Sequence, residues 1–117
     1  MTRGDIYWAD LAPRSGSEQS GRRPVIVVSH DGFNQTRNWR SVIVVPMSIS
    51  KAQAKRGLTA VEIPAGANGL NRPGIAICHQ VTTVDRSKLT RYTGRLSRAL
   101  LDSVDEGLRA ALDLDEV

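Results

Sequence analysis

The sequence predicts a mainly β domain of the α+β class, in which a small barrel of short strands carries one C-terminal helix. Three observations predict this fold: β-branched runs recur at regular spacing, the apolar period becomes helical after residue 96, and the chain has 117 residues. That length is typical of one domain with its own core. Since no repeat, linker or low-complexity tract interrupts the sequence, residues 1–117 are expected to form a single domain.

Short runs rich in β-branched and aromatic residues predict the strands. Residues 5–11 alternate imperfectly and give the first strand. Residues 24–29 and 41–46 are continuous apolar runs, which suit strands that are buried on both faces or that curl around a small barrel. Shorter strands are expected at residues 60–63, 75–78, 81–84 and 92–96, the first two of them separated by the turn-rich residues 64–69.

The residues after Leu96 predict one amphipathic helix. Ser97 is a favourable N-cap residue, and Gly107 lowers the helix propensity by about 1 kcal/mol. Apolar side chains recur on one helical face and acidic side chains on the other. The apolar face consists of Leu100, Leu101, Val104, Leu108, Ala111 and Leu112, and the acidic face of Asp102, Asp105 and Glu106.

Positive charge is concentrated in the body of the chain. The whole chain has a formal charge of +4, but residues 102–117 carry a net charge of −5, which leaves +9 for residues 1–101. Thirteen of the 16 basic residues are arginine, whose planar guanidinium matches phosphate oxygens and favours a nucleic-acid partner. A GC-rich genome that encodes arginine in place of lysine is the alternative explanation, and composition alone does not separate the two.

Composition excludes several classes of protein. One cysteine, Cys78, allows no disulfide framework, and its apolar neighbours indicate a small core residue. No apolar run approaches the ~20 residues that cross a bilayer, and Asp5 stands where a signal peptide needs apolar residues. We therefore expect a cytoplasmic protein with no membrane partner. With two distant histidines and no glycine-rich phosphate or dinucleotide motif, neither a metal nor a cofactor is expected.

Two long polar connections are the segments expected to carry function. Residues 12–23 join the first two strands and residues 47–58 follow the third, and both are cationic. Loops of this length are uncommon in compact domains and are usually functional or mobile. The first loop ends in Arg22 and Arg23, which should project in opposite directions as the buried strand begins. The alternative interpretation is a solvated loop without function. Hydroxyl groups at the end of the third strand argue against this alternative, because they add further polar side chains that could serve a site.

The two histidines give a second catalytic hypothesis, because paired imidazoles can cleave RNA by acid–base catalysis. His30 opens a polar turn and is expected at the surface, whereas His79 ends a strand beside Gln80, where it can face a ligand. Nothing in their spacing supports a paired mechanism.

Four segments of the chain form a recognisable series: residues 3–11 (RGDIYWADL), 16–24 (GSEQSGRRP), 44–48 (VVPMS) and 80–85 (QVTTVD). In this order they resemble the MazF/PemK family of bacterial toxins. The second is the most specific, and the resemblance extends from about Arg3 to Leu114. It implies an SH3-like barrel of the plasmid-maintenance-toxin type and a homodimer. It also implies a sequence-specific, metal-independent endoribonuclease that cuts single-stranded RNA, such as mRNA, and is neutralised by a cognate antitoxin, whose complex binds DNA.

The resemblance also implies roles for single residues. The family's catalytic arginine falls on Arg23 and its catalytic hydroxyl, usually threonine, on Ser48, while Glu18 matches the glutamate of the loop motif. Serine keeps the hydroxyl but lacks the methyl group that restricts the rotamer of threonine. His79 stands where relatives commonly have an acidic residue, and Thr82 where many have arginine. The candidate RNA-binding residues are Ser17, Gln19, Arg22, Arg56, His79 and Gln80, with Phe33 and Trp39 as stacking surfaces or ordinary packing residues.

The implied reaction is attack of a ribose 2′-hydroxyl on the adjacent phosphate, which leaves a 2′,3′-cyclic phosphate and a 5′-hydroxyl. We expect Arg23 to stabilise charge rather than act as a base, because at pH 7 fewer than about one arginine in 10⁵ is deprotonated. The proton is then left to Glu18, His79 or water. Two alternatives stay open: a non-catalytic RNA- or DNA-binding barrel, and a gyrase poison on the same scaffold.

Overall fold

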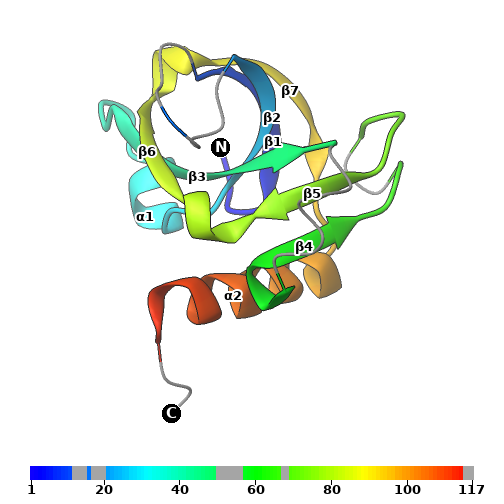
Figure 1. The fold of residues 1–117 in the computed structure, drawn as a ribbon. Coiled ribbons are helices and arrows are strands. Elements are labelled where there is room, and N and C mark those ends of the chain that lie inside the picture. The colour runs from blue at the N-terminus through cyan, green and yellow to red at the C-terminus, as the bar shows by residue number, and fades with distance from the viewer. Residues whose placement is uncertain (12–15, 17–20, 50–56, 67–68, 115–117) are drawn as a thin grey trace.

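The computed structural model describes residues 1–11, 16, 21–49, 57–66 and 69–114. As predicted, these residues form short strands followed by one long helix (Figure 1). The strands are β1 (Asp5–Asp10), β2 (Arg22–Val27), β3 (Ser41–Ser48), β4 (Ala60–Ile63), β5 (Gly74–Ile77), β6 (Thr82–Asp85) and β7 (Leu89–Arg95). The helices are α1 (Asp31–Asn34) and α2 (Arg98–Leu112), with 3-10 turns η2 (Cys78–Gln80) and η3 (Arg86–Lys88).

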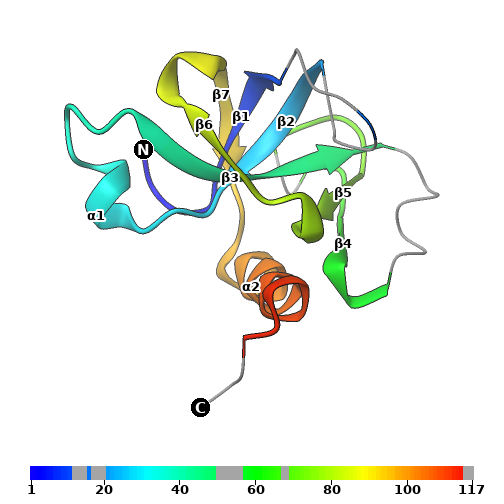
Figure 2. The ribbon, with the colours of Figure 1, turned by 60° about the vertical axis from the view of Figure 1, so that its left-hand side comes forward.

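The long strand β3 joins the two parts of the sheet. The strand order is β4-β5-β3-β2-β1-β7, and β6 also pairs with β3. The first half of β3 lies antiparallel to β6, with Val42 opposite Val84, whereas its end lies antiparallel to β5, with Met47 opposite Ala76. The sheet curls into a small barrel, and the β4–β5 hairpin extends from it above α2 (Figures 1 and 2).

Alternation along the strands divides the buried side chains into two clusters. One cluster, around Val25 and Val44, fills the barrel, and the other, around Ile26 and Val104, lies between the sheet and α2. Because successive side chains of a strand face opposite sides, β2 and β3 contribute to both clusters. This double burial explains why both strands have continuous β-branched sequences.

The helix α2 packs on the sheet through the predicted face. Its N-cap is Ser97, whose Oγ accepts a hydrogen bond from the Leu100 N–H at 3.2 Å. Gly107 is buried, and a Cβ there would lie only 2.6 Å from the Cys78 Sγ. Leu112, which we expected on the buried face, is 52% exposed because it is the last residue of the helix. No helix within the described residues has the length and apolar content needed to span a membrane.

Strand pairing moves two of the predicted boundaries. β2 begins at Arg22, which pairs with Asp10 on β1. β3 continues to Ser48, which pairs with Ile75 on β5. The first two residues of the expected loop 47–58 therefore belong to a strand, because partners from distant parts of the sequence extend the ladder.

Two short helical segments differ from the sequence prediction. His79, expected at the end of a strand, lies in the 3-10 turn η2. The helix α1 was expected to be only a polar turn. It begins at an N-cap formed by His30, whose Nδ1 accepts a hydrogen bond from the Gly32 N–H at 2.8 Å. A helix of four residues is too short to give a periodic pattern in the sequence.

Candidate functional site

Arg23 lies where β2 begins and Ser48 where β3 ends, and both line one pocket. The β2–β3 register pairs Val25 with Pro46, and the same register continued by two residues sets Arg23 across from Ser48. Neighbouring strands lie about 4.8 Å apart, so the guanidinium and the hydroxyl can contact one phosphate group. Ser48 is only 5% exposed and Arg23 is half-buried. The structure thus brings together the two residues to which the family resemblance assigns catalysis.

A pocket of about 590 Å³ opens beside this pair. Its walls come from β1, from the ends of β2 and β3, from β7 and from the segment that precedes β5. The described residues that line it include four arginines and no aspartate or glutamate. The pocket is therefore a cationic concavity, suited to an anionic ligand. The four arginines are Arg22, Arg23, Arg72 and Arg91.

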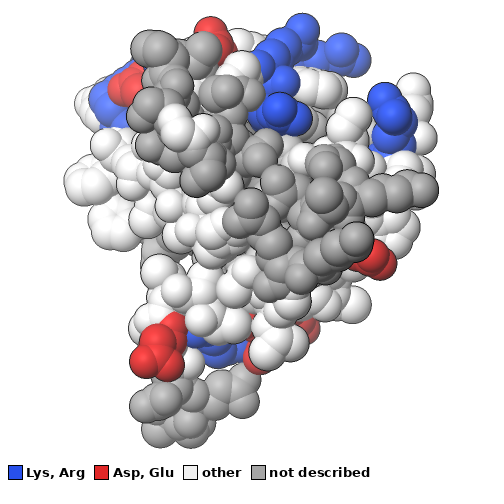
Figure 3. All heavy atoms as spheres, viewed as in Figure 1, with Lys and Arg blue, Asp and Glu red and all other residues white. Residues whose placement is uncertain are grey.

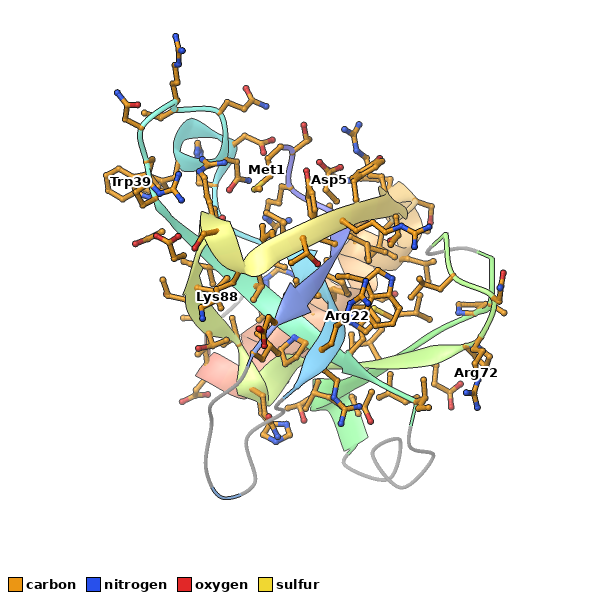
Figure 4. The ribbon with its side chains drawn as sticks, turned by 90° about the horizontal axis from the view of Figure 1, so that it is seen from above. Met1, Asp5, Arg22, Trp39, Arg72 and Lys88 are labelled. Carbon is orange, nitrogen blue, oxygen red and sulfur yellow. The ribbon has the colours of Figure 1, made fainter. Side chains whose placement is uncertain are left out.

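Arg22 and Arg23 project to opposite faces of β2, as the sequence predicts. The Arg22 guanidinium lies 5.1 Å from the centre of the Trp8 ring, in cation–π contact. Arg23 instead pairs with Ala9, which is buried in the barrel cluster. Figure 4 shows Arg22 between β2 and the β4–β5 hairpin, with Arg72 at the tip of that hairpin.

Five arginines elsewhere on the described surface are paired with carboxylates, whereas Arg37 is exposed and in no such pair within the described ranges, and Arg86 donates hydrogen bonds to backbone carbonyls. Arg3 contacts Asp105 at 2.5 Å, and Arg95 contacts Asp5 at 2.7 Å. Within the described ranges, no such ion pair involves Arg22, Arg72 or Arg91, and all three are exposed. Figure 3 shows several basic side chains gathered on the upper right of the molecule. The remaining paired arginines are Arg40, Arg98 and Arg109, with Asp85, Asp102 and Glu106.

Several of the residues suggested by the sequence do not line the pocket. His79 is exposed and Gln80 half-buried on η2, outside the pocket lining. Phe33 and Trp39 are exposed with ring centres 4.8 Å apart, and Figure 4 shows Trp39 at the far end of the molecule from Arg72. The predictions for Ser17, Glu18, Gln19 and Arg56 lie outside the described residues.

Sequence reasoning missed Arg72 and Arg91. Arg91 reaches the pocket because β7 pairs with β1, where Arg91 lies opposite Trp8. This pairing joins residues more than 80 positions apart, and no local pattern indicates it. Arg72 follows the turn-rich segment after β4, and its charge was the only available signal.

The structure also bears on Cys78 and on the paired-histidine hypothesis. Cys78 is fully buried, and burial raises the pKa of its thiol to about 12. The thiol is therefore protonated at neutral pH, and Cys78 is the core residue that the sequence predicted. Because the His30 Nδ1 caps α1, the paired-histidine hypothesis gains no support. Among the described residues, no three His, Cys, Asp or Glu side chains form a group that could hold a metal ion.

Comparison with known proteins identifies the family. Residues 2–112 match the PemK-like, MazF-like toxins of type II toxin–antitoxin systems. The chain is 38% identical over 114 residues to endoribonuclease EndoA of Bacillus subtilis, covering 97% of this chain and 96% of that protein. It is 36% identical to endoribonuclease MazF6 of Mycobacterium tuberculosis, with 97% and 98% covered.

Solved structures have the same fold. Mycobacterium tuberculosis toxin MazF-mt6 superposes with a TM-score of 0.76 at 26% identity, covering 96% of this chain and 99% of that one. MazF from Deinococcus radiodurans gives a TM-score of 0.79 at 24% identity, with 97% of each chain covered. The predicted toxin barrel is thus confirmed, and the chain belongs to the PemK-like, MazF-like toxin family of type II toxin–antitoxin systems.

Proposed function

We propose that this protein is a sequence-specific endoribonuclease toxin that cleaves single-stranded RNA without a metal ion. The observation that carries the proposal is that Arg23, at the start of β2, and Ser48, at the end of β3, line one pocket together with three further arginines. Relatives that are 36% to 38% identical over 97% of the chain are named endoribonucleases, which supports the same activity here.

In the proposed reaction, Arg23 and Ser48 stabilise a phosphorane-like transition state electrostatically. The ribose 2′-oxygen attacks the adjacent phosphorus as its proton is removed, and the bond to the 5′-oxygen breaks as that oxygen gains a proton. The products are a 2′,3′-cyclic phosphate and a 5′-hydroxyl. Arg23 can donate two parallel hydrogen bonds to the phosphate oxygens, and Ser48 can donate one.

Burial strengthens the contribution of Ser48. Its side chain is almost fully removed from solvent, and a hydrogen bond in such surroundings is electrostatically stronger than one in water. Since His79 lies outside the pocket lining, we assign proton transfer to Glu18 or to water.

The proposed partners are single-stranded RNA, a second copy of the chain and a cognate antitoxin. Solved relatives include an endoribonuclease in complex with its cognate antitoxin from mycobacterial species and the MazE–MazF complex of Deinococcus radiodurans. The net charge of +9 on residues 1–101 favours an acidic segment of an antitoxin by electrostatic complementarity. We place the protein in the cytoplasm, where its RNA substrate is found.

The deciding experiment is incubation of the purified protein with a long single-stranded RNA in EDTA. Arg23→Ala is the test variant, and Arg98→Ala, an exposed position on α2, is the matched control. We expect discrete cuts with 5′-hydroxyl ends from the native protein and the control, and none from Arg23→Ala. Primer extension maps the cuts. RNA binding without cleavage by all three proteins would contradict the proposal and favour a non-catalytic binding barrel.

A further inference from the structure

Strand β7 is longer than the segment of β1 with which it pairs. Residues 5–9 of β1 pair with residues 89–95 of β7, and the register shifts twice along this length. Thr93 is the extra residue at one shift and Thr90 is the extra residue at the other. An extra residue in one strand of an antiparallel pair is a β-bulge, so β7 has two bulges, each with a threonine.

The hydroxyl groups of these two threonines hold the bulges against β1. Thr93 Oγ1 donates a hydrogen bond to the Ile6 carbonyl oxygen, and Thr90 Oγ1 donates one to the Trp8 carbonyl oxygen, each at 3.2 Å. A bulge interrupts the regular ladder of backbone hydrogen bonds, and a side chain can take the place of a backbone partner. The two hydroxyl groups therefore keep β7 attached to β1 where the ladder is irregular.

The bulges decide which face of the sheet Arg91 occupies. Arg91 lies opposite Trp8, and both residues line the pocket. Without the bulges, a register fixed at either end of β7 would place Arg91 opposite Tyr7 or Ala9, which contribute to the cluster that fills the barrel. Because a shift of one residue moves a side chain to the other face of a sheet, the bulges turn Arg91 from the barrel interior to the pocket.

The charge of Arg91 favours the bulged register. A guanidinium placed against the apolar barrel cluster would lose its hydration, which is costly unless the charge is paired. In the bulged register the side chain of Arg91 is exposed, on the pocket wall. There it can meet water or an anionic ligand.

We propose that Thr90 is a positioning residue for the reaction, which acts by holding Arg91 on the pocket wall. Among the described residues, Thr90 is not one of those that line the pocket, but its hydroxyl anchors the bulge directly beside Arg91. Thr93 lines the pocket itself, so Thr90 is the residue that separates positioning from direct contact with RNA. The inference rests on the proposed endoribonuclease function and adds to it a residue that aims a cation at the RNA.

Two substitutions of Thr90 test this role. Thr90→Val removes the hydroxyl and keeps the branched shape, whereas Thr90→Ser keeps the hydroxyl. Ser103→Ala is the matched control, because Ser103 Oγ also donates to a backbone carbonyl at 3.2 Å, that of Ala99, but on α2. Fluorescence anisotropy gives the dissociation constant of a short labelled single-stranded RNA with 2′-deoxyribose at the cut position. Single-turnover cleavage at saturating protein gives the rate constant.

We expect Thr90→Val to raise the dissociation constant about three- to tenfold. The rate constant at saturating protein should not change, because Arg23 and Ser48 stay in place. Arg91→Ala should weaken RNA binding about tenfold, and Thr90→Val should then add no further loss, because the threonine acts through this guanidinium. Thr90→Ser and Ser103→Ala should bind RNA as the native protein does.

A spectroscopic measurement reports the position of Arg91 without RNA. Arg91 lies opposite Trp8, so the Trp8 indole N–H resonance in a ¹H–¹⁵N spectrum senses the guanidinium, and Trp39→Phe assigns the resonance. We expect Thr90→Val to shift this resonance as Arg91→Ala does, and Thr90→Ser to leave it in place.

Three results would overturn the proposal: native RNA affinity in either Thr90→Val or Arg91→Ala, strictly additive losses in the double variant, or a Trp8 resonance that Thr90→Val does not move. Neither the affinity nor the resonance depends on cleavage. A native protein that cuts no RNA would therefore refute the proposed function and still leave the role of Thr90 decided by these two measurements.

Discussion

Gly69 lies directly against the backbone of Thr93, so that a Cβ at position 69 would stand 2.0 Å from the Thr93 carbonyl oxygen. Gly69 also has a φ of 74°, in the left-handed region that favours glycine. The contact holds the segment between β4 and β5 against β7. Because Arg72 follows Gly69 closely and Arg91 lies beside Thr93, this contact sets the distance between opposite walls of the pocket.

Replacement of Gly69 should damage both stability and RNA binding. Gly69→Ala forces the segment away from β7, and we expect it to lower the free energy of unfolding by about 2 kcal/mol or more and to weaken RNA binding. Gly66→Ala is the matched control, because Gly66 has a φ of 83° but no atom of the described residues would lie within 4 Å of a Cβ there. Urea denaturation and anisotropy measure the two effects, and equal losses in both variants would contradict the explanation.

Gly107 should tolerate alanine only if Cys78 is made smaller. A Cβ at position 107 would lie 2.6 Å from the Cys78 Sγ and 3.1 Å from Val61. We therefore expect Gly107→Ala to destabilise the protein by about 1 to 3 kcal/mol, although alanine has the higher helix propensity. In the double variant with Cys78→Ala, part of this loss should be recovered. A double-mutant cycle by urea denaturation measures the coupling, and strict additivity would exclude the steric cause.

Lysine at position 23 should not support cleavage as arginine does. Lysine keeps the charge but is a point donor, which cannot form two parallel hydrogen bonds with a phosphate. We expect Arg23→Lys to lose most of the cleavage rate, on the order of 10²-fold or more, while the melting temperature changes little because Arg23 is only half-buried. Single-turnover cleavage of a defined RNA checks this, and near-native turnover would show that charge alone suffices.

Acid should lower the stability of the folded protein through two carboxylates near α1 and η3. Hydrogen bonds from Ser87, together with Arg40, hold the pKa of Asp85 well below its usual range, and the Asn34 side chain lowers the pKa of Asp31. A carboxylate with a depressed pKa in the folded state stabilises the protein fully above the unfolded value of ~3.9 and loses this effect as the pH falls through the folded value.

The melting temperature should therefore fall below pH ~4, and Asp85→Asn should reduce this dependence. Glu62→Gln, at an exposed position on β4, serves as the control. Calorimetry from pH 7 to pH 2 measures both variants. Identical pH profiles for Asp85→Asn and the native protein would rule out a role for this carboxylate.

Local sequence patterns predict the elements of this fold well, because each has a clear chemical signal. β-branched runs mark β2 and β3, and Ser97 with an apolar period marks α2. The pairing of β1 with β7 has no such signal, since two register irregularities along β1, at Ile6/Tyr7 and Trp8/Ala9, depend on tertiary packing. Strand boundaries shifted for the same reason, as partners extended β2 and β3 beyond their apolar runs.

The residues of the candidate site likewise could be predicted from the sequence only in part. Arg23 and Ser48 could be predicted, because each lies in a motif that resembles a known family and on a strand with a strong pattern. Arg91 and Arg72 join the pocket only through contacts between distant segments. Their sequence neighbours do not distinguish them from the arginines that form surface ion pairs.

The pairing of β1 with β7 has a consequence for synthesis of the protein. The strand β7, which pairs with β1, lies about 80 residues later in the chain. At 5–20 residues per second, the ribosome needs about 4 to 16 s to synthesise these residues. During that interval the β1–β2 hairpin has an open edge, and Trp8 has no Arg91 beside it. A nascent chain that has not yet exposed β7 thus lacks the wall that Arg91, Tyr92 and Thr93 give to the pocket, and RNA near the ribosome exit meets the finished pocket only after most of the chain has emerged.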